Sequence, residues 1–182
     1  MDILSDSALM QKVQTGQVDA LGLLYERYKK VLYAYFYNVI GHTANSEDLV
    51  QTVFVRILKY KHQYKGQGAF KSWMFTIARN AMIDKMRKGK SKFHYTIDDY
   101  TDKLVDHKRT DDLVKKNEEL QMLKDALGRL DKETRELIVL VKLNEMKYRE
   151  VAEMTGMNES TIKVKVFRGI QSLKSLCATH KN

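Results

Sequence analysis

Apolar residues recur at helical spacing along most of this chain. Leu9, Met10 and Val13 would share one face of a short helix that begins at residue 5 or 6 and ends at Gly16. A second apolar face runs through residues 18–40, and apolar pairs four residues apart predict a third helix that begins at Asn45 or Ser46. A fourth helix is predicted over residues 69–87. These helices, with shared apolar faces, would form one compact N-terminal bundle.

Helical periodicity is lost over residues 89–112 and returns after them, with helices expected over 113–130, 131–143, 147–154 and 159–176. Aspartates accumulate in the aperiodic stretch, which we interpret as an acidic flexible linker over residues 91–112. It is either a solvated tether or an acidic strand that occupies a basic channel in a partner. The expected domains are therefore residues 1–90 and 113–182.

Composition supports a helical fold. The 182 residues include no proline and only 9 glycines, so the residues that end strands and build hairpins are scarce. We expect the all-α class, with two small helical domains joined by the flexible linker. One cysteine excludes an internal disulfide framework and fits a reducing cytoplasm. Since no run of about 18 apolar residues exists and the N-terminus is not signal-like, we expect a protein that is neither exported nor membrane-spanning.

The charge balance indicates a polyanionic partner. The formal net charge is +9, and basic residues gather between Arg79 and Lys92 and again between Lys163 and Lys181. Two basic regions so far apart in sequence predict two contacts with one nucleic acid.

The most specific local pattern lies between residues 148 and 170 and predicts a helix-turn-helix. Ala152 is small where two helices would cross, and Gly156 can adopt the left-handed conformation that ends the first helix. Met157 and Ile162 would fill the angle between the helices, and Asn158 would cap the second one. The second helix of such a motif enters a DNA major groove. The alternative is a plain helical hairpin with a solvated charged face.

Residues that would point outward from this second helix are the candidate DNA contacts: Glu159, Ser160, Thr161, Lys163, Lys165 and Arg168. Ile162, Val166, Ile170 and Leu173 would face inward.

A second candidate nucleic-acid site lies in FKSWMFTIARNAMIDKMRKGK. Aromatic side chains next to amides and cations can stack on unpaired bases and hydrogen-bond to their edges. Core packing is the competing interpretation for Trp73, the single tryptophan. The candidates are Phe70, Trp73, Arg79, Asn80, Asp84, Lys85, Arg87 and Lys88.

Four segments in this order and spacing resemble a bacterial RNA polymerase sigma factor of the extracytoplasmic-function (ECF) group. They are ALGLLYERYKKVLYAYFY, NSEDLVQTVFVRILKY, FKSWMFTIARNAMIDKMRK and LGRLDKETRELIVLVKLNEMKYREVAEMTGMNESTIKVKVFRGIQSLK. The resemblance implies an N-terminal domain that binds the clamp helices of the largest polymerase subunit and captures the minus-ten promoter element. It also implies a C-terminal domain that recognises the minus-thirty-five element and binds the flap of the second-largest subunit.

The resemblance also assigns roles to individual residues. Asn80 falls at the specificity-loop position of the minus-ten region, where the alternative is a local cap that holds the loop, and Trp73 would support the melted strand. Ser160, Thr161, Lys163, Lys165 and Arg168 fall where the family's recognition helix meets DNA. SEDLVQTVF resembles the clamp-binding helix and implicates Asp48, Gln51, Thr52 and Phe54 in polymerase binding, with core packing as the alternative for Phe54.

Three positions depart from the family's usual pattern. Asp131 follows Leu130 where the family has a proline, Val164 stands in place of a small polar residue, and Gly169 replaces an alanine. We expect the same fold despite these substitutions. They affect the residues that would set base specificity at the minus-thirty-five element.

The leading hypothesis is therefore a non-enzymatic promoter-specificity subunit, without cofactor or metal, that works in the cytoplasm. Its partners would be core RNA polymerase, promoter DNA and an anti-sigma factor, membrane-anchored or not, and the free protein would be a monomer. The alternative is a stand-alone helix-turn-helix regulator of duplex DNA. An RNA-binding protein is disfavoured because a major-groove helix has little use on A-form RNA.

Overall fold

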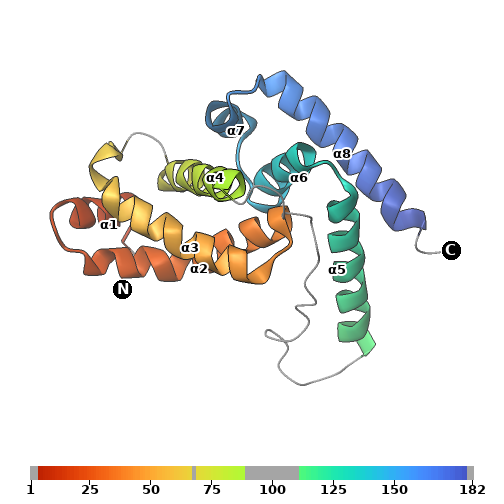
Figure 1. Ribbon diagram of the computed structural model, residues 1–182, viewed down its shortest axis with the longest axis horizontal. Coiled ribbons are helices and arrows are strands. Elements are labelled where there is room, and N and C mark those ends of the chain that lie inside the picture. The colour runs from red at the N-terminus through yellow and green to blue at the C-terminus, as the bar shows by residue number, and fades with distance from the viewer. Residues whose placement is uncertain (1–3, 67–68, 89–110, 180–182) are drawn as a thin grey trace. The chain divides into compact units, whose positions relative to one another are not determined.

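The computed structural model describes residues 4–66, 69–88 and 111–179, and the regular structure within these ranges is helical (Figure 1). The first elements are α1 (Asp6–Gln14), α2 (Asp19–Ile40), α3 (Thr43–Lys59), the 3₁₀ turn η1 (Lys61–Gln63) and α4 (Phe70–Lys88). They are followed by α5 (Asp111–Arg129), α6 (Lys132–Ile138), the π-helical turn η2 (Val139–Leu143), α7 (Tyr148–Thr155) and α8 (Glu159–Thr179). The expected all-α class is confirmed.

Two compact units make up the chain: residues 1–36 with 44–93, and residues 37–43 with 94–182. Most of the predicted linker lies outside the described residues. Its last two positions, Asp111 and Asp112, already belong to α5, so this helix begins two residues before the expected start.

The first unit is built around the apolar faces of α1 to α4. Fully buried side chains come from every one of these helices, because the spacing of their apolar residues brings all of them to one side. Representative members are Met10, Leu24, Leu32, Phe36, Leu49, Ile57, Met74 and Phe75. This core holds α3 and α4 together, and these two helices contain every predicted site residue of the first half.

Polar contacts from α1 fix the turn between α3 and α4. The Gln14 amide donates to the carbonyl oxygens of Lys61 (2.8 Å) and Tyr64 (2.7 Å). Lys61 Nζ donates in turn to the Val13 carbonyl at 3.1 Å, and the hydroxyls of Ser7 and Tyr64 lie 2.9 Å apart. Helix α1 therefore positions Tyr64, which packs against the predicted site.

The second unit is organised around α8, which contacts α5, α6 and α7. A buried arginine, Arg135 on α6, holds the end of α5. Its guanidinium donates to the carbonyl oxygens of Leu127 (2.8 Å), Gly128 (2.9 Å) and Leu130 (2.7 Å). These carbonyls lie at and just beyond the C-terminal end of α5, where a helix has few backbone N–H donors left to offer, so a charged donor there joins α5 firmly to α6.

Two further differences from the predicted helices have a local cause. Helix α3 begins at Thr43 rather than at Asn45 or Ser46, because Gly41 (φ +76°) ends α2 early enough for a new helix to start two residues on. The helix expected over 131–143 changes to a wider π turn at Val139. There the backbone N–H of Asn144 (3.0 Å) and its side-chain amide (2.9 Å) both donate to the Val139 carbonyl, which favours the five-residue turn.

Candidate nucleic-acid interface

A surface hollow of about 450 Å³ lies over α3, η1 and α4 in the first unit. It brings together three predicted site residues, Trp73, Asn80 and Asp84, which lie on the same face of α4. The lining residues are Arg56, Tyr60, Gln63, Trp73, Thr76, Ile77, Asn80, Ile83 and Asp84. Aromatic, amide and guanidinium groups in one open hollow are the chemistry that holds an unstacked base.

Trp73 is partly exposed and is held from behind by other rings. Its ring centroid lies 5.3 Å from that of Tyr64 and 6.1 Å from that of Phe70. Phe70 itself is only 2% exposed and also packs against Tyr28 at 5.6 Å. The prediction that Phe70 is a stacking platform is therefore wrong, because a ring enclosed on all sides presents no face to a base. Phe70 supports Trp73 instead.

Asn80 is exposed and lies inside α4, eight residues before its last residue, Lys88. The segment is helical here rather than a loop, because Ala81 and Met82 are buried on the core side and keep the helix intact. An amide in mid-helix caps nothing, so the alternative role of Asn80 as a local cap is wrong.

The Asp84 carboxylate forms ion pairs with two arginines. Its partners are Arg56 of α3 (2.9 Å) and Arg87 of its own helix (3.4 Å). The hydrogen bond from Arg56 is the main reason that the pKa of Asp84 lies below the usual range. A carboxylate in this position is repelled by phosphate, so its effect is to orient the guanidinium of Arg56 at the edge of the hollow.

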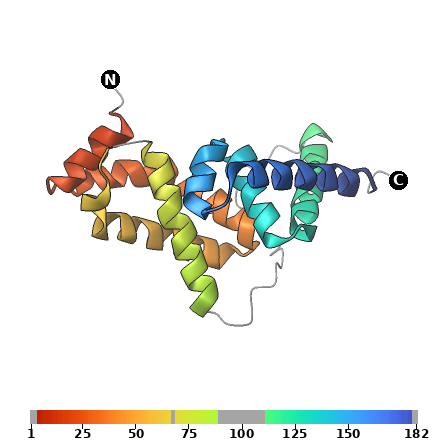
Figure 2. The same cartoon turned by 90° about the horizontal axis from the view of Figure 1, so that it is seen from above.

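The basic end of α4 projects from the unit. Figure 2 shows α4 crossing its unit diagonally, with its C-terminal end extending beyond α3. Arg87 and Lys88 are exposed at this end, and Arg79 is partly exposed one residue before Asn80. Lys85 differs, since its ammonium lies 3.1 Å from the carboxylate of Asp48 on α3.

The outer face of α3 contains three of the four predicted polymerase contacts. Asp48 and Gln51 are exposed, and Thr52 is partly exposed, with its hydroxyl donating to the Asp48 carbonyl at 2.8 Å. Phe54 is 7% exposed and packs edge-on against Tyr25, with ring centroids 5.0 Å apart. It therefore belongs to the core, which was the alternative to polymerase binding for this residue.

Sequence reasoning missed the neighbouring residue on this face. Val55 is 67% exposed and lies four residues after Gln51, on the same side of α3. The signal was present in the sequence, because the buried pairs 49/50 and 53/54 and the buried residue 57 form a stripe that leaves position 55 outside it.

The corner between α7 and α8 has the predicted helix-turn-helix geometry. Gly156 adopts a left-handed conformation (φ +72°), and its N–H donates to the Ala152 carbonyl at 2.9 Å, which ends α7. The Asn158 side chain accepts hydrogen bonds from the Ser160 N–H (2.9 Å) and hydroxyl (2.7 Å), which caps α8. Ile162 and Val166 are fully buried beneath the corner.

The predicted DNA-facing residues of α8 divide into two groups. Ser160, Thr161, Lys163 and Arg168 are exposed. Lys163 pairs with Glu159 one turn earlier, at 2.7 Å, and its ammonium lies 5.6 Å from the centre of the Tyr148 ring.

Lys165 instead lies at the side of the helix. It pairs with Glu133 of α6 at 2.8 Å, and that hydrogen bond raises the pKa of the Lys165 ammonium. Two exposed apolar residues of α8, Val164 and Phe167, were absent from the predicted set.

Two of the family departures have structural reasons. The Asp131 side chain accepts from the Thr134 N–H at 2.9 Å and caps α6, a role that needs an oxygen which proline lacks. Gly169 lies against α6, where an added Cβ would come within 2.5 Å of Thr134 Cγ2 and 2.7 Å of Ile138 Cδ1. Together with the ion pair between Lys165 and Glu133, these contacts fix α8 on α6.

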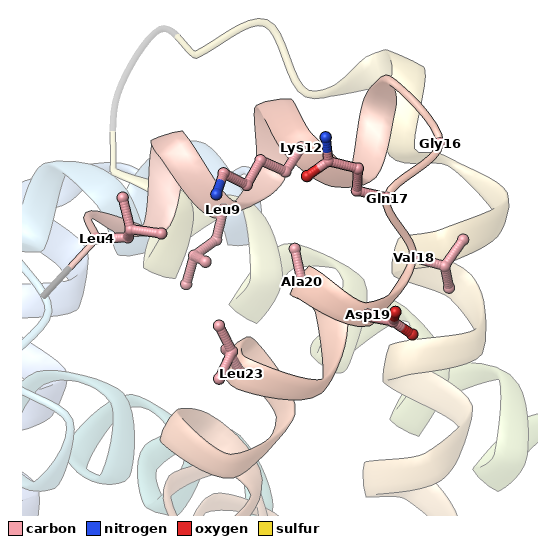
Figure 3. A pocket seen from close by; sticks show the side chains of 9 residues that line it. All are labelled: Leu4, Leu9, Lys12, Gly16, Gln17, Val18, Asp19, Ala20 and Leu23. Atoms are coloured by element: carbon pink, nitrogen blue, oxygen red, sulfur yellow. The ribbon is translucent and has the colours of Figure 1, made fainter.

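A larger hollow, of about 610 Å³, lies between α1 and the start of α2 and includes none of the predicted site residues (Figure 3). Figure 3 shows Leu9 of α1 and Leu23 of α2 directed toward the space between the two helices. Among the described residues, no three His, Cys, Asp or Glu side chains are grouped in a way that could hold a metal ion. None of the described helices is both long and apolar enough to cross a bilayer.

Comparison with known proteins identifies the family. Residues 24–92 match the family model described as Sigma-70 region 2, and residues 120–173 match the one described as Sigma-70, region 4. The ECF RNA polymerase sigma factor BldN of Streptomyces coelicolor is 32% identical over 177 residues, which are 94% of this chain and 67% of that protein. This chain belongs to the ECF RNA polymerase sigma factors.

Two solved structures share the fold, one of them of a sigma factor. RpoE from Bartonella quintana, in complex with the anti-sigma factor NepR, has a TM-score of 0.66 at 26% identity over 85% of this chain and 92% of that one. CnrH, in complex with the cytosolic domain of CnrY, has a TM-score of 0.70 at 22% identity over 96% of this chain and 97% of that one, and supports the fold alone.

This sigma factor binds core RNA polymerase and promoter DNA and directs promoter-specific initiation of transcription. Both matched regions contain predicted contact residues, whereas a stand-alone helix-turn-helix regulator would need only the second. The regulator alternative has no support in these comparisons.

Proposed function

We propose that residues 1–90 of this sigma factor bind the polymerase clamp and the minus-ten element, and that residues 113–182 recognise the minus-thirty-five element. Residues 91–112 would join the two as a flexible linker. This division is supported by the two family regions: 120–173 falls inside the second proposed domain, and 24–92 lies in the first apart from its last two residues.

The observation that most favours this function is that Trp73 and Asn80 line one hollow. Opening a duplex costs a few kcal/mol for each unstacked base, and a protein that melts DNA without ATP must recover this cost by binding the extruded base. The Trp73 ring offers a stacking surface, and the Asn80 amide offers a donor and an acceptor to one base edge. Arg79, Arg87 and Lys88 would contact the phosphates around the captured base.

Replacing Asn80 tests this proposal. Asn80→Ala, assembled with core polymerase, is expected to lose about 1–3 kcal/mol of discrimination at one position of single-stranded minus-ten oligonucleotides in which each base is changed in turn. Its thermal midpoint and its affinity for core polymerase should match those of wild type. Gln11→Ala, which removes an exposed amide from α1, is the control. Equal loss of all sequences with a lower thermal midpoint would reject base recognition by Asn80.

The outer face of α8 is the proposed contact with the minus-thirty-five element. Ser160, Thr161 and Lys163 lie in its first turns, which is the part of a recognition helix that reaches base edges, and Arg168 follows on the same side. Lys165 pairs with Glu133 of α6, so we assign it to holding α8 in place rather than to base contact. Glu159 pairs with Lys163 within α8, and we assign this carboxylate to orienting the Lys163 ammonium.

Core polymerase would bind the outer face of α3 through Asp48, Gln51 and Thr52. Val55 takes the place of Phe54 in this proposal because it is a largely exposed apolar residue on that face. An apolar side chain surrounded by polar ones is typical of a protein interface.

The remaining assignments follow from the family. We propose that the chain has no catalytic activity, acts as a monomer when free and works in the cytoplasm, where its polymerase partner is found. An anti-sigma factor as a further partner is supported by the 26% identity to RpoE of Bartonella quintana, which was solved with one. Co-purification from host cells would identify such a partner.

A further inference from the structure

Two apolar side chains occupy the outward face of α8. Val164 is 47% exposed and Phe167 is 64% exposed, whereas the buried residues of this helix, Ile162, Val166 and Leu173, lie on the opposite side. Val164 comes four residues after Ser160 and four before Arg168, so these three side chains form one row along the helix. Val164 is therefore at the middle of the face that the proposed function directs at DNA.

The side chains around Val164 define what this face can bind. Lys163 and Arg168 flank it and are exposed, so the surrounding surface is basic and fits a phosphate backbone. Valine has no donor or acceptor, and a base edge placed against it would lose water without gaining a hydrogen bond. The major groove presents one apolar group, the 5-methyl of thymine, which makes favourable contacts with apolar side chains.

We propose that Val164 recognises a thymine of the minus-thirty-five element through its 5-methyl group, with Phe167 covering the outer side of the same contact. This inference rests on the proposed function, because it requires α8 to lie in the major groove of that element. It explains why a valine stands where the family's usual residue is small and polar. A hydroxyl can hydrogen-bond to the edges of several different bases, whereas a branched aliphatic side chain favours thymine, the base that has a methyl group.

Deoxyuridine provides a direct test, because it differs from thymidine only by lacking the 5-methyl group. Holoenzyme is assembled from core polymerase and the sigma factor, and its affinity is measured for promoter duplexes in which each thymine of the upstream element is replaced singly by deoxyuridine. At one position we expect a loss of about fourfold, which corresponds to the roughly 0.8 kcal/mol gained by burying one such group. In Val164→Ser the same replacement should change the affinity by less than about 1.5-fold.

Val18→Ser is the matched control. Val18 is also 47% exposed, and it lies in the turn between α1 and α2 and belongs to neither proposed DNA contact. This variant should keep the fourfold sensitivity of wild type.

The outcomes separate the inference from the proposed function. If deoxyuridine is neutral at every position while the upstream element is still protected in footprints, recognition of the methyl group is wrong and the proposed role of α8 stands. A fourfold loss that persists in Val164→Ser also overturns the inference. If scrambling the upstream element leaves binding unchanged, α8 does not recognise it, and both proposals fail.

Discussion

Asp48 of α3 and Lys85 of α4 form an ion pair, with 3.1 Å between carboxylate and ammonium. The pair joins a residue on the proposed polymerase-binding face to one beside the proposed minus-ten site. Lys85 therefore has two possible partners, the Asp48 carboxylate and a DNA phosphate, and the first is occupied in the free protein. Each function of the first unit can be probed by changing one member of this pair.

Asp48→Asn is expected to weaken binding to core polymerase by about tenfold, equivalent to about 1.4 kcal/mol, because it removes a charge from the binding face. The free energy of unfolding should change by no more than about 1 kcal/mol, since Asp48 is largely exposed and surface ion pairs contribute little. Fluorescence anisotropy with labelled sigma factor and a thermal melt measure the two quantities. Glu26→Gln is the control, because it removes an exposed carboxylate that pairs with Lys29 on α2.

Lys85→Ala addresses the other member of the pair. If the ammonium transfers from Asp48 to a phosphate when DNA binds, the plot of log affinity against log salt concentration for the holoenzyme should become shallower by about one unit. A slope identical to that of wild type would restrict Lys85 to holding α3 against α4.

Gly169→Ala should destabilise the protein by about 1 kcal/mol even though alanine is the better helix former. Overpacking against α6 costs about 1–3 kcal/mol and exceeds the gain in helix propensity of about 1 kcal/mol. The double variant with Thr134→Ser, which removes the nearer clashing atom, Cγ2, should recover part of the loss in chemical denaturation, since Ile138 Cδ1 remains 2.7 Å from the added Cβ. Gly22→Ala is the control, because an added Cβ on this α2 glycine meets nothing within 4 Å and should stabilise. A single Gly169→Ala variant more stable than wild type would contradict the close approach of α8 to α6.

Asp131 should make the second unit sensitive to acid. The hydrogen bond from the Thr134 N–H is the main reason that the pKa of Asp131 is lowered below the usual aspartate value of 3.8 in the folded protein. A lowered pKa means that the capped carboxylate stabilises the fold fully above pH 3.8 and loses this effect as pH falls through the folded pKa. Thermal melts from pH 6 to pH 2 should show a steeper loss for wild type than for Asp131→Asn, which keeps a neutral cap. Parallel curves for the two proteins would refute this role.

Helices and the helix-turn-helix corner were predictable because they depend on local spacing. Apolar periodicity placed α1, α2 and α4 within one residue of their observed starts, and Gly156 and Asn158 marked the corner. Core packing was one of the two interpretations of Phe54, and its 7% exposure agrees with it, whereas the exposure of Val55 was not predicted.

Contacts between distant residues could not be predicted from spacing. Asp48 and Lys85 are 37 residues apart in sequence, and Arg56 and Asp84 are 28 apart, so nothing local indicates that they pair. The burial of Phe70 depends on Tyr28 and Tyr64, which come from other elements. The exposure of Val164 follows from its position on the helix. It was left out of the expected DNA contacts because only polar and charged side chains were considered for that role.

The most direct measurement of the division between the two units is transcription by core polymerase from a promoter series in which every base pair of both elements is changed singly. Wild type, Asn80→Ala and Arg168→Ala are compared on the whole series. We expect Asn80→Ala to lose discrimination at one position of the minus-ten element alone, and Arg168→Ala to lose it within the minus-thirty-five element alone. Loss of discrimination spread equally over both elements in either variant would contradict the assignment of one element to each unit.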